Sequence, residues 1–158
     1  MDVIWGAVFG MKTSAILDAW SIEHILSGIS VGSTVKHHNH RELARVVTRT
    51  HPHLPDPEVH HSWRFDLFVV LGLAYVWETL EHYLETGLAG AAVEYWFQGV
   101  EYWPNRLIAD PLMMVVGYEI ARRWPRAVWP ARTISFAWLV VHIAIFPHSM
   151  YLHEVFAA

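Results

Sequence analysis

Glutamate and histidine recur at helical spacing within one apolar stretch of the chain, residues 65–85. Glu78, Glu81, His82 and Glu85 follow one another at intervals of one to three residues, so they share one side of a helix. An ionisable side chain at membrane depth is costly unless it faces a protein interior, a partner or a metal ion. Helix bundles hold Zn, Mn or Fe with inward-facing Glu and His side chains at such spacings. We therefore predict that Glu78, Glu81 and His82 are metal ligands.

Further candidate ligands come from other segments at the same predicted depth. His24 lies near the start of the first of four predicted helices, and Asp110 near the start of the third. Glu101 lies in the connection before Asp110, and His148 near the end of the fourth helix. A cluster of carboxylates and imidazoles repels itself at neutral pH unless protons or cations occupy it. The sequence thus predicts a divalent-metal site of His24, Glu78, Glu81, His82 and Asp110, with Glu101 and His148 as second choices.

Four apolar segments must position these groups. They cover residues 15–35, 65–85, 107–124 and 133–156, and the lengths suit helices that cross the hydrocarbon layer of a membrane. Gly28 and Gly32 in the first segment have the spacing of a helix-packing face. Asp18 and Glu85 lie at helix ends, where Asp18 suits a helix cap and Glu85 is expected to reach the lipid headgroups. The predicted fold is one all-α domain, a polytopic membrane bundle of four transmembrane helices.

The composition supports a membrane protein. Of the 158 residues, 54% are hydrophobic and only 16% are charged, whereas soluble domains carry about 25% charged residues. The absence of cysteine excludes disulfides and thiolate metal sites, and leaves histidine and carboxylates as the strong metal ligands. Nothing in the sequence is typical of a phosphate-binding loop, a Ser-His-Asp catalytic set or a nucleic-acid-binding surface, so no nucleic-acid partner is expected.

Two connections have unusual compositions. Residues 36–64 are polar and Pro-containing, which favours a His-rich loop that binds metal weakly or is merely solvated. Its histidines are His37, His38, His40, His51, His53, His60 and His61. Residues 87–103 are apolar but interrupted by Glu, Gln and Gly and rich in Tyr and Trp, which is typical of an interfacial or re-entrant segment.

The basic residues predict an orientation. Nine of the 11 Lys and Arg residues lie in the two connections between the first and second and between the third and fourth helices; Lys12 and Arg106 lie on the other side. Because cytoplasmic loops are enriched in Lys and Arg, both connections are expected in the cytoplasm and both termini outside. The predicted metal site then lies near the outer membrane face.

Short motifs resemble a known group of membrane proteins. Trp77-Glu78-xx-Glu81, followed by Asn105-xxxx-Asp110, is similar to small, uncharacterised bacterial inner-membrane proteins loosely grouped with the VanZ-like families. The resemblance implies a bacterial inner-membrane location and site residues His24, Glu78, Glu81, Asn105 and Asp110. The chain departs from the pattern by having Glu101 where Asp is expected and by its His-rich connection.

Three functions agree with this sequence. The first is metal handling or transport, in which the lipid bilayer and a divalent ion, Zn, Fe or Mn, are the partners. The second is a metal-dependent membrane enzyme that acts on a lipid or lipid-linked substrate. The third is a non-catalytic subunit that assembles as a homo-oligomer or with a membrane-complex partner.

Overall fold

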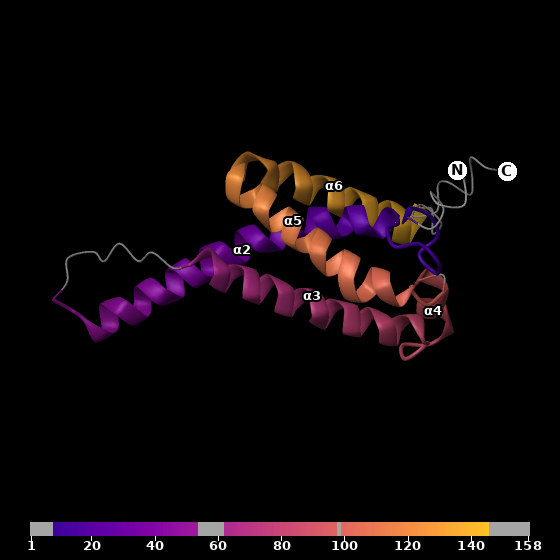
Figure 1. Ribbon diagram of the computed structural model, residues 1–158, viewed down its shortest axis with the longest axis horizontal. Helices are drawn as coiled ribbons and strands as arrows, with labels where there is room; N and C mark the ends of the chain where they lie inside the picture. The colour runs from indigo at the N-terminus through magenta and orange to yellow at the C-terminus, as the bar shows by residue number, and fades with distance from the viewer. Residues whose placement is uncertain (1–7, 54–61, 98, 146–158) are drawn as a thin grey trace.

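The structure is a computed structural model that describes residues 8–53, 62–97 and 99–145, and Figure 1 shows its helices. Within these ranges the regular structure is entirely helical, which confirms the all-α prediction. The main helices are α2 (Ala19–Thr50), α3 (Trp63–Glu85), α4 (Ala91–Phe97), α5 (Asp110–Arg123) and α6 (Val128–Val140). A π-helical turn, Asn105–Ala109, precedes α5, a 3-10 turn, Pro125–Ala127, precedes α6, and a second π-helical turn, Val141–Ile145, follows it.

Helix α2 is the central element and packs against α3, α5 and α6. It begins at a capping box, in which the Asp18 side chain accepts a hydrogen bond from the Ser21 backbone N–H and the Ser21 hydroxyl lies 3.2 Å from the Asp18 backbone nitrogen. The prediction that Asp18 suits a helix cap is therefore confirmed. The final part of α2 extends past the other helices (Figure 1).

The predicted loop over residues 36–64 is wrong for its first half, because α2 continues without a break to Thr50. The sequence turns polar after Val35, yet it contains no Pro or Gly before Pro52, and its Lys, Arg, Glu, Leu and Ala residues are good helix formers. The remainder of the segment, residues 54–61, lies outside the described residues. The first helix therefore covers residues 19–50 rather than 15–35.

The other predicted helices are present with shifted ends. The prediction for residues 65–85 agrees with α3, and that for 107–124 agrees with the π-helical turn plus α5. The predicted fourth helix begins five residues early, at Val128, and its predicted end beyond Ile145 lies outside the described residues. The segment 87–103 contains the short helix α4.

Glycines bring α2 and α5 into backbone contact. A Cβ atom on Gly28 would lie 2.2 Å from the carbonyl oxygen of Met114, and one on Gly117 would lie 2.2 Å from that of Ile25. One turn further on, a Cβ on Gly32 would lie 2.8 Å from the Tyr118 ring. The prediction that Gly28 and Gly32 form a helix-packing face is confirmed, since only glycine permits this approach.

Many polar groups are buried in the interior of the bundle beside two apolar clusters, while large apolar side chains cover its outside. All four acidic residues of α3, Asp66, Glu78, Glu81 and Glu85, are buried. Its exposed large side chains include Phe68, Val76, Trp77 and Leu80. Contiguous exposed apolar surface of this kind marks a membrane or protein interface.

Among the described residues, the helical segment Pro125–Ile145 is long and apolar enough to cross a membrane, by length and composition. The bundle of four spans stays a prediction. In α3, the four acidic residues that lower its mean hydropathy are buried.

Candidate metal centre

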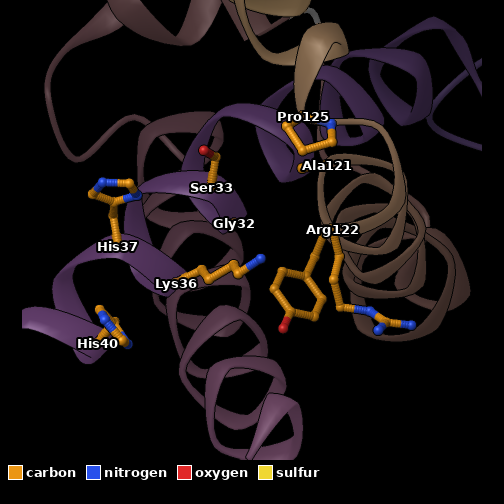
Figure 2. A pocket seen from close by; sticks show the side chains of 9 residues that line it. Gly32, Ser33, Lys36, His37, His40, Ala121, Arg122 and Pro125 are labelled. Atoms are coloured by element: carbon orange, nitrogen blue, oxygen red, sulfur yellow. The ribbon is translucent and has the colours of Figure 1, made fainter. Parts of the chain in front are cut away.

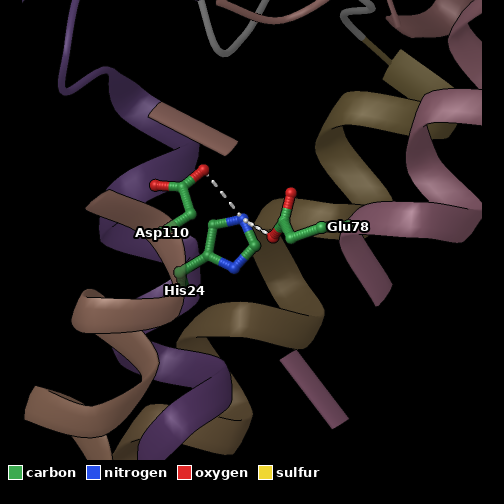
Figure 3. A group of neighbouring side chains, drawn as sticks. All are labelled: His24, Glu78 and Asp110. Carbon is green, nitrogen blue, oxygen red and sulfur yellow. Dashed lines mark ion pairs between the residues drawn. The ribbon is translucent and has the colours of Figure 1, made fainter. Parts of the chain in front are cut away.

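Three buried side chains from three helices meet at one point. His24 from α2, Glu78 from α3 and Asp110 from α5 are 5%, 1% and 0% exposed, respectively. Figure 3 shows the His24 ring between the two carboxylates: its Nε2 atom lies 3.1 Å from Asp110 Oδ2 and 3.5 Å from Glu78 Oε1. One ligand atom from each residue lies within 4.8 Å of the other two, so this group could hold a metal ion.

The carboxylate oxygens that face this point lack hydrogen-bond donors among the described residues. Both oxygens of Glu78 and Oδ2 of Asp110 are inaccessible to solvent and accept no hydrogen bond, although Arg106 Nε lies 4.0 Å from Glu78 Oε2. His24 Nε2 is close enough for an ion pair but does not meet the hydrogen-bond geometry. Buried carboxylate oxygens are costly when unpaired, so their presence points to a missing cation or proton.

The other side of Asp110 is held in place by a polar network. Its Oδ1 atom accepts a hydrogen bond of 2.7 Å from the Ser21 hydroxyl, which belongs to the cap of α2. Asn105 lies beside this pair and donates to Asp18 Oδ2 at 3.3 Å and to Glu101 Oε1 at 3.0 Å. Because these bonds fix the start of both α2 and α5, Asp110 Oδ2 is directed toward His24 (Figure 3).

A second charged group lies next to the first. Lys12 and Arg106 both donate to the carboxylate of Glu85, and Lys12 Nζ also lies 3.8 Å from Glu81 Oε1. Glu85 accepts a further hydrogen bond of 3.1 Å from the backbone N–H of Glu101. The prediction that Glu85 reaches the headgroups is therefore wrong, because two cations hold it inside the bundle. Glu81, placed by the sequence among the ligands, pairs with Lys12 instead of joining His24, Glu78 and Asp110.

Glu101 lies at the edge of both groups. Burial, together with the nearby Asp110 and Glu81 carboxylates, raises the pKa of Glu101 far above its usual range. Its Oε2 atom lies 3.5 Å from Arg106 Nη2 and has no hydrogen-bond partner. A protonated Glu101 lowers the excess of negative charge without contributing a ligand.

His82, like Glu81 and Glu101, lies outside the group of His24, Glu78 and Asp110. His82 is exposed, and its Nδ1 atom lies 3.1 Å from Arg106 Nη1. Successive residues turn by about 100° around a helix, so His82 lies about 40° from Glu78 on the side away from Glu81 and Glu85. His148 lies outside the described residues.

Sequence reasoning did not assign Lys12 and Arg106 to the site. They are the only Lys or Arg residues predicted on the outer side, where the acidic residues also lie. This shared side is the signal that could have placed them among the acids. At this end of the bundle they are two buried cations beside six buried carboxyl groups, those of Asp18, Glu78, Glu81, Glu85, Glu101 and Asp110. Negative groups therefore remain in excess around His24.

No protein-family model, curated protein or solved structure matches this chain. The resemblance to the VanZ-like families stays a prediction.

Proposed function

We propose that the protein is an integral membrane protein that holds a divalent metal ion at His24, Glu78 and Asp110. The observation that carries this proposal is the meeting of three buried ligand atoms whose carboxylate oxygens have no hydrogen-bond donor. A cation at this point would supply the missing partner and offset part of the excess negative charge.

The spacing of the ligand atoms supports a bound metal. Two ligands that each lie about 2.0–2.1 Å from a tetrahedral metal ion are separated by about 3.3 Å. The distances of 3.1 and 3.5 Å from His24 Nε2 to Asp110 and Glu78 lie on either side of this value, and the three ligand atoms lie within 4.8 Å of one another. One imidazole and two carboxylates suit Zn, Fe or Mn, and three protein ligands leave a coordination position open.

The membrane location is supported by the distribution of side chains. Exposed Phe, Leu, Val and Trp side chains cover α3 and α6, whereas Lys, Glu, Asp and Asn are buried among the helices. Lipid would stabilise the first group and the bundle interior the second. We place the acidic end near the outer face of a bacterial inner membrane, with the basic residues of α2 and α5 on the cytoplasmic side.

The form of metal handling that agrees best with the packing is retention of the ion. Between His24 and the basic end of the bundle, the backbone contact of Gly28 with Met114 and the packing of Val70, Ala74 and Tyr118 fill the interior. Along this line, transport across the membrane would require α2 and α5 to separate at these contacts.

Elemental analysis of detergent-purified protein tests this proposal. We expect about one Zn, Fe or Mn per chain after removal of loosely bound ions. Glu78→Gln should lower retention at least tenfold, because the amide cannot provide an anionic ligand. Glu119→Gln is the matched control, since this acid lies on the surface of α5 and pairs with Arg122. Wild-type protein that is folded yet free of metal would contradict the proposal and favour a protonated His24 between two carboxylates.

A cavity beside His24 supports a second candidate function, a metal-dependent enzyme that acts on a lipid. The cavity has a volume of about 430 Å³ and lies among α2, α3, α5 and α6. His24 and Trp77 form part of its wall, and its polar lining includes Glu23 and Ser135, which share a hydrogen bond. An alkyl chain in this space would lie against His24, one of the three residues that would hold the metal.

A cavity-filling substitution tests the enzyme. Ser27→Leu adds bulk to the cavity wall from α2, and it should abolish turnover of added membrane lipids while leaving the metal content unchanged. Mass spectrometry of lipids incubated with the purified protein would detect the product. Thr133→Leu, at an exposed position of α6, is a control for added apolar bulk. If wild-type protein with bound metal yields no new lipid species, the enzyme is excluded and metal retention remains.

A further inference from the structure

A second cavity lies at the opposite end of the bundle from the metal centre. Figure 2 shows it between α2 and the end of α5, and its volume is about 420 Å³. Its lining contains no acidic residue. The lining residues are Gly32, Ser33, Lys36, His37, His40, Tyr118, Ala121, Arg122 and Pro125. We call this space the basic pocket.

Cationic side chains reach the basic pocket from two helices. Lys36 extends from α2 toward α5, and Arg122 projects from the last turn of α5 (Figure 2). Two imidazoles, those of His37 and His40, flank Lys36 on the α2 side. The Arg122 guanidinium points away from Lys36 and lies 5.9 Å from the centre of the Trp63 ring, so it would have to turn toward Lys36 for one ligand to contact both.

The floor of the basic pocket is formed by close packing. Gly32 lies against Tyr118, and Ala121 next to it is also small. The Tyr118 hydroxyl is directed away toward Asp66, to which it donates a hydrogen bond of 3.1 Å. Larger side chains at Gly32 or Ala121 would occupy the space that the cations surround.

The charge of Arg122 is shared with one acid. Its Nε and Nη2 atoms donate to Glu119 at distances between 2.9 and 3.2 Å. Glu119 lies outside the pocket lining, whereas Lys36 and Arg122 lie within it. Arg132 adds a further cation in a neighbouring cavity that shares Ser33 and His37 with the basic pocket. The positive charge on this side of the bundle therefore exceeds what Glu119 can balance.

The position of the basic pocket suits the phosphate layer of a membrane. Trp63, Trp124 and Trp129 are exposed at the same end of the bundle. Tryptophan is enriched where a membrane protein meets the headgroups, and basic pockets between spanning helices on the cytoplasmic side bind anionic headgroups. Lys and Arg both recognise phosphate through charge-assisted hydrogen bonds.

We propose that the basic pocket binds a phosphate group, carried either by a lipid headgroup or by a soluble anion. Lys36 and Arg122 hold the phosphate oxygens from opposite walls, and the small side chains of Gly32 and Ala121 leave room for it. This site is separate from the metal centre and does not depend on a bound metal.

Native mass spectrometry of the detergent-purified full chain tests this inference. The probes are phosphatidic acid and diacylglycerol with identical acyl chains, which differ by the phosphate alone, and inorganic phosphate is the competitor. We expect retention of phosphatidic acid over diacylglycerol, and about a tenfold loss of this preference in Lys36→Gln/Arg122→Gln. The matched control Arg41→Gln/Arg126→Gln removes the same charge from exposed positions outside the pocket and should retain the preference.

The competitor separates the two sources of phosphate. If millimolar inorganic phosphate displaces phosphatidic acid from wild-type protein but has no effect on the pocket variant, a soluble phosphate is the ligand. If it does not displace the lipid, the ligand is the headgroup. Equal retention of the two lipids without phosphate binding, or equal losses in the two double variants, would overturn the inference. Metal content and helical circular dichroism should be unchanged in both variants, so a failure here leaves the metal centre untouched.

Discussion

Gly117→Ala is expected to destabilise the bundle more than any other single methyl addition within α5. The new Cβ would lie 2.2 Å from the carbonyl oxygen of Ile25 and 2.8 Å from the backbone of Gly28, so α2 and α5 would have to separate. Overpacking of a well-packed interior costs about 1–3 kcal/mol, and a clash with backbone atoms belongs at the upper end of that range. At about 2–4 °C per kcal/mol, the midpoint of thermal unfolding in detergent should fall by about 10 °C.

Gly72→Ala is the matched control for this prediction. Gly72 lies on α3, and a Cβ atom there would have no neighbour within 4 Å. Because alanine favours the helix and restricts the unfolded chain, this variant should be as stable as the wild type or about 0.4–1 kcal/mol more stable. If both variants unfold at the wild-type temperature, the close contact of α2 with α5 is wrong.

Lys12→Met is expected to have an effect of similar size through charge rather than volume. Lys12 is 0% exposed and pairs with Glu81 and Glu85, and methionine would fill much of its space without its charge. Removing one partner from a buried ion pair costs about 3–5 kcal/mol, because the remaining charge is left uncompensated. Arg106 still pairs with Glu85, so Glu81 is the acid that loses its cation. Thermal unfolding followed by circular dichroism would measure the loss.

Two further variants separate charge from packing at this position. Lys12→Met/Glu81→Gln removes the unpaired acid and should recover a large part of the lost stability. Lys36→Met makes the same substitution at an exposed lysine of α2 and should change stability by less than about 0.5 kcal/mol. Equal stability of Lys12→Met and the wild type would show that Lys12 is not a buried cation of the bundle.

The three residues of the metal centre could be brought together from the sequence because each interrupts an apolar helix. His24, Glu78 and Asp110 fall at one membrane depth when successive spans alternate in direction, and the structure places them in contact. Depth alone does not determine the direction of a side chain around its helix axis. For this reason Glu81 and His82 were grouped with the ligands, although one pairs with Lys12 and the other is exposed.

The length of α2 departs furthest from what the sequence predicts. A hydropathy profile predicts that the helix ends where the apolar residues end, at about Val35. In the structure, the helix continues to Thr50. Polar residues with good helix propensity continue the same helix until Pro52. The positions of Lys12 and Arg106 in the sequence indicate only the orientation of the chain in the membrane. Their pairing with buried acids depends on tertiary contacts, which the order of residues along the chain does not reveal.

Because α2 is one unbroken helix, a movement of its end near Thr50 can be transmitted to His24 near its start. Its 32 residues span about 48 Å, and it has a close backbone contact with α5 at Gly28. His24 lies about 6 Å from that point along the axis and Thr50 about 33 Å from it on the far arm. If α2 pivots as a rigid rod, a sideways displacement of about 5 Å at Thr50 moves His24 by about 1 Å. Metal–ligand distances vary by only about 0.2 Å in a bound site. A force on the end of α2 near Thr50 would therefore weaken binding of an ion at His24.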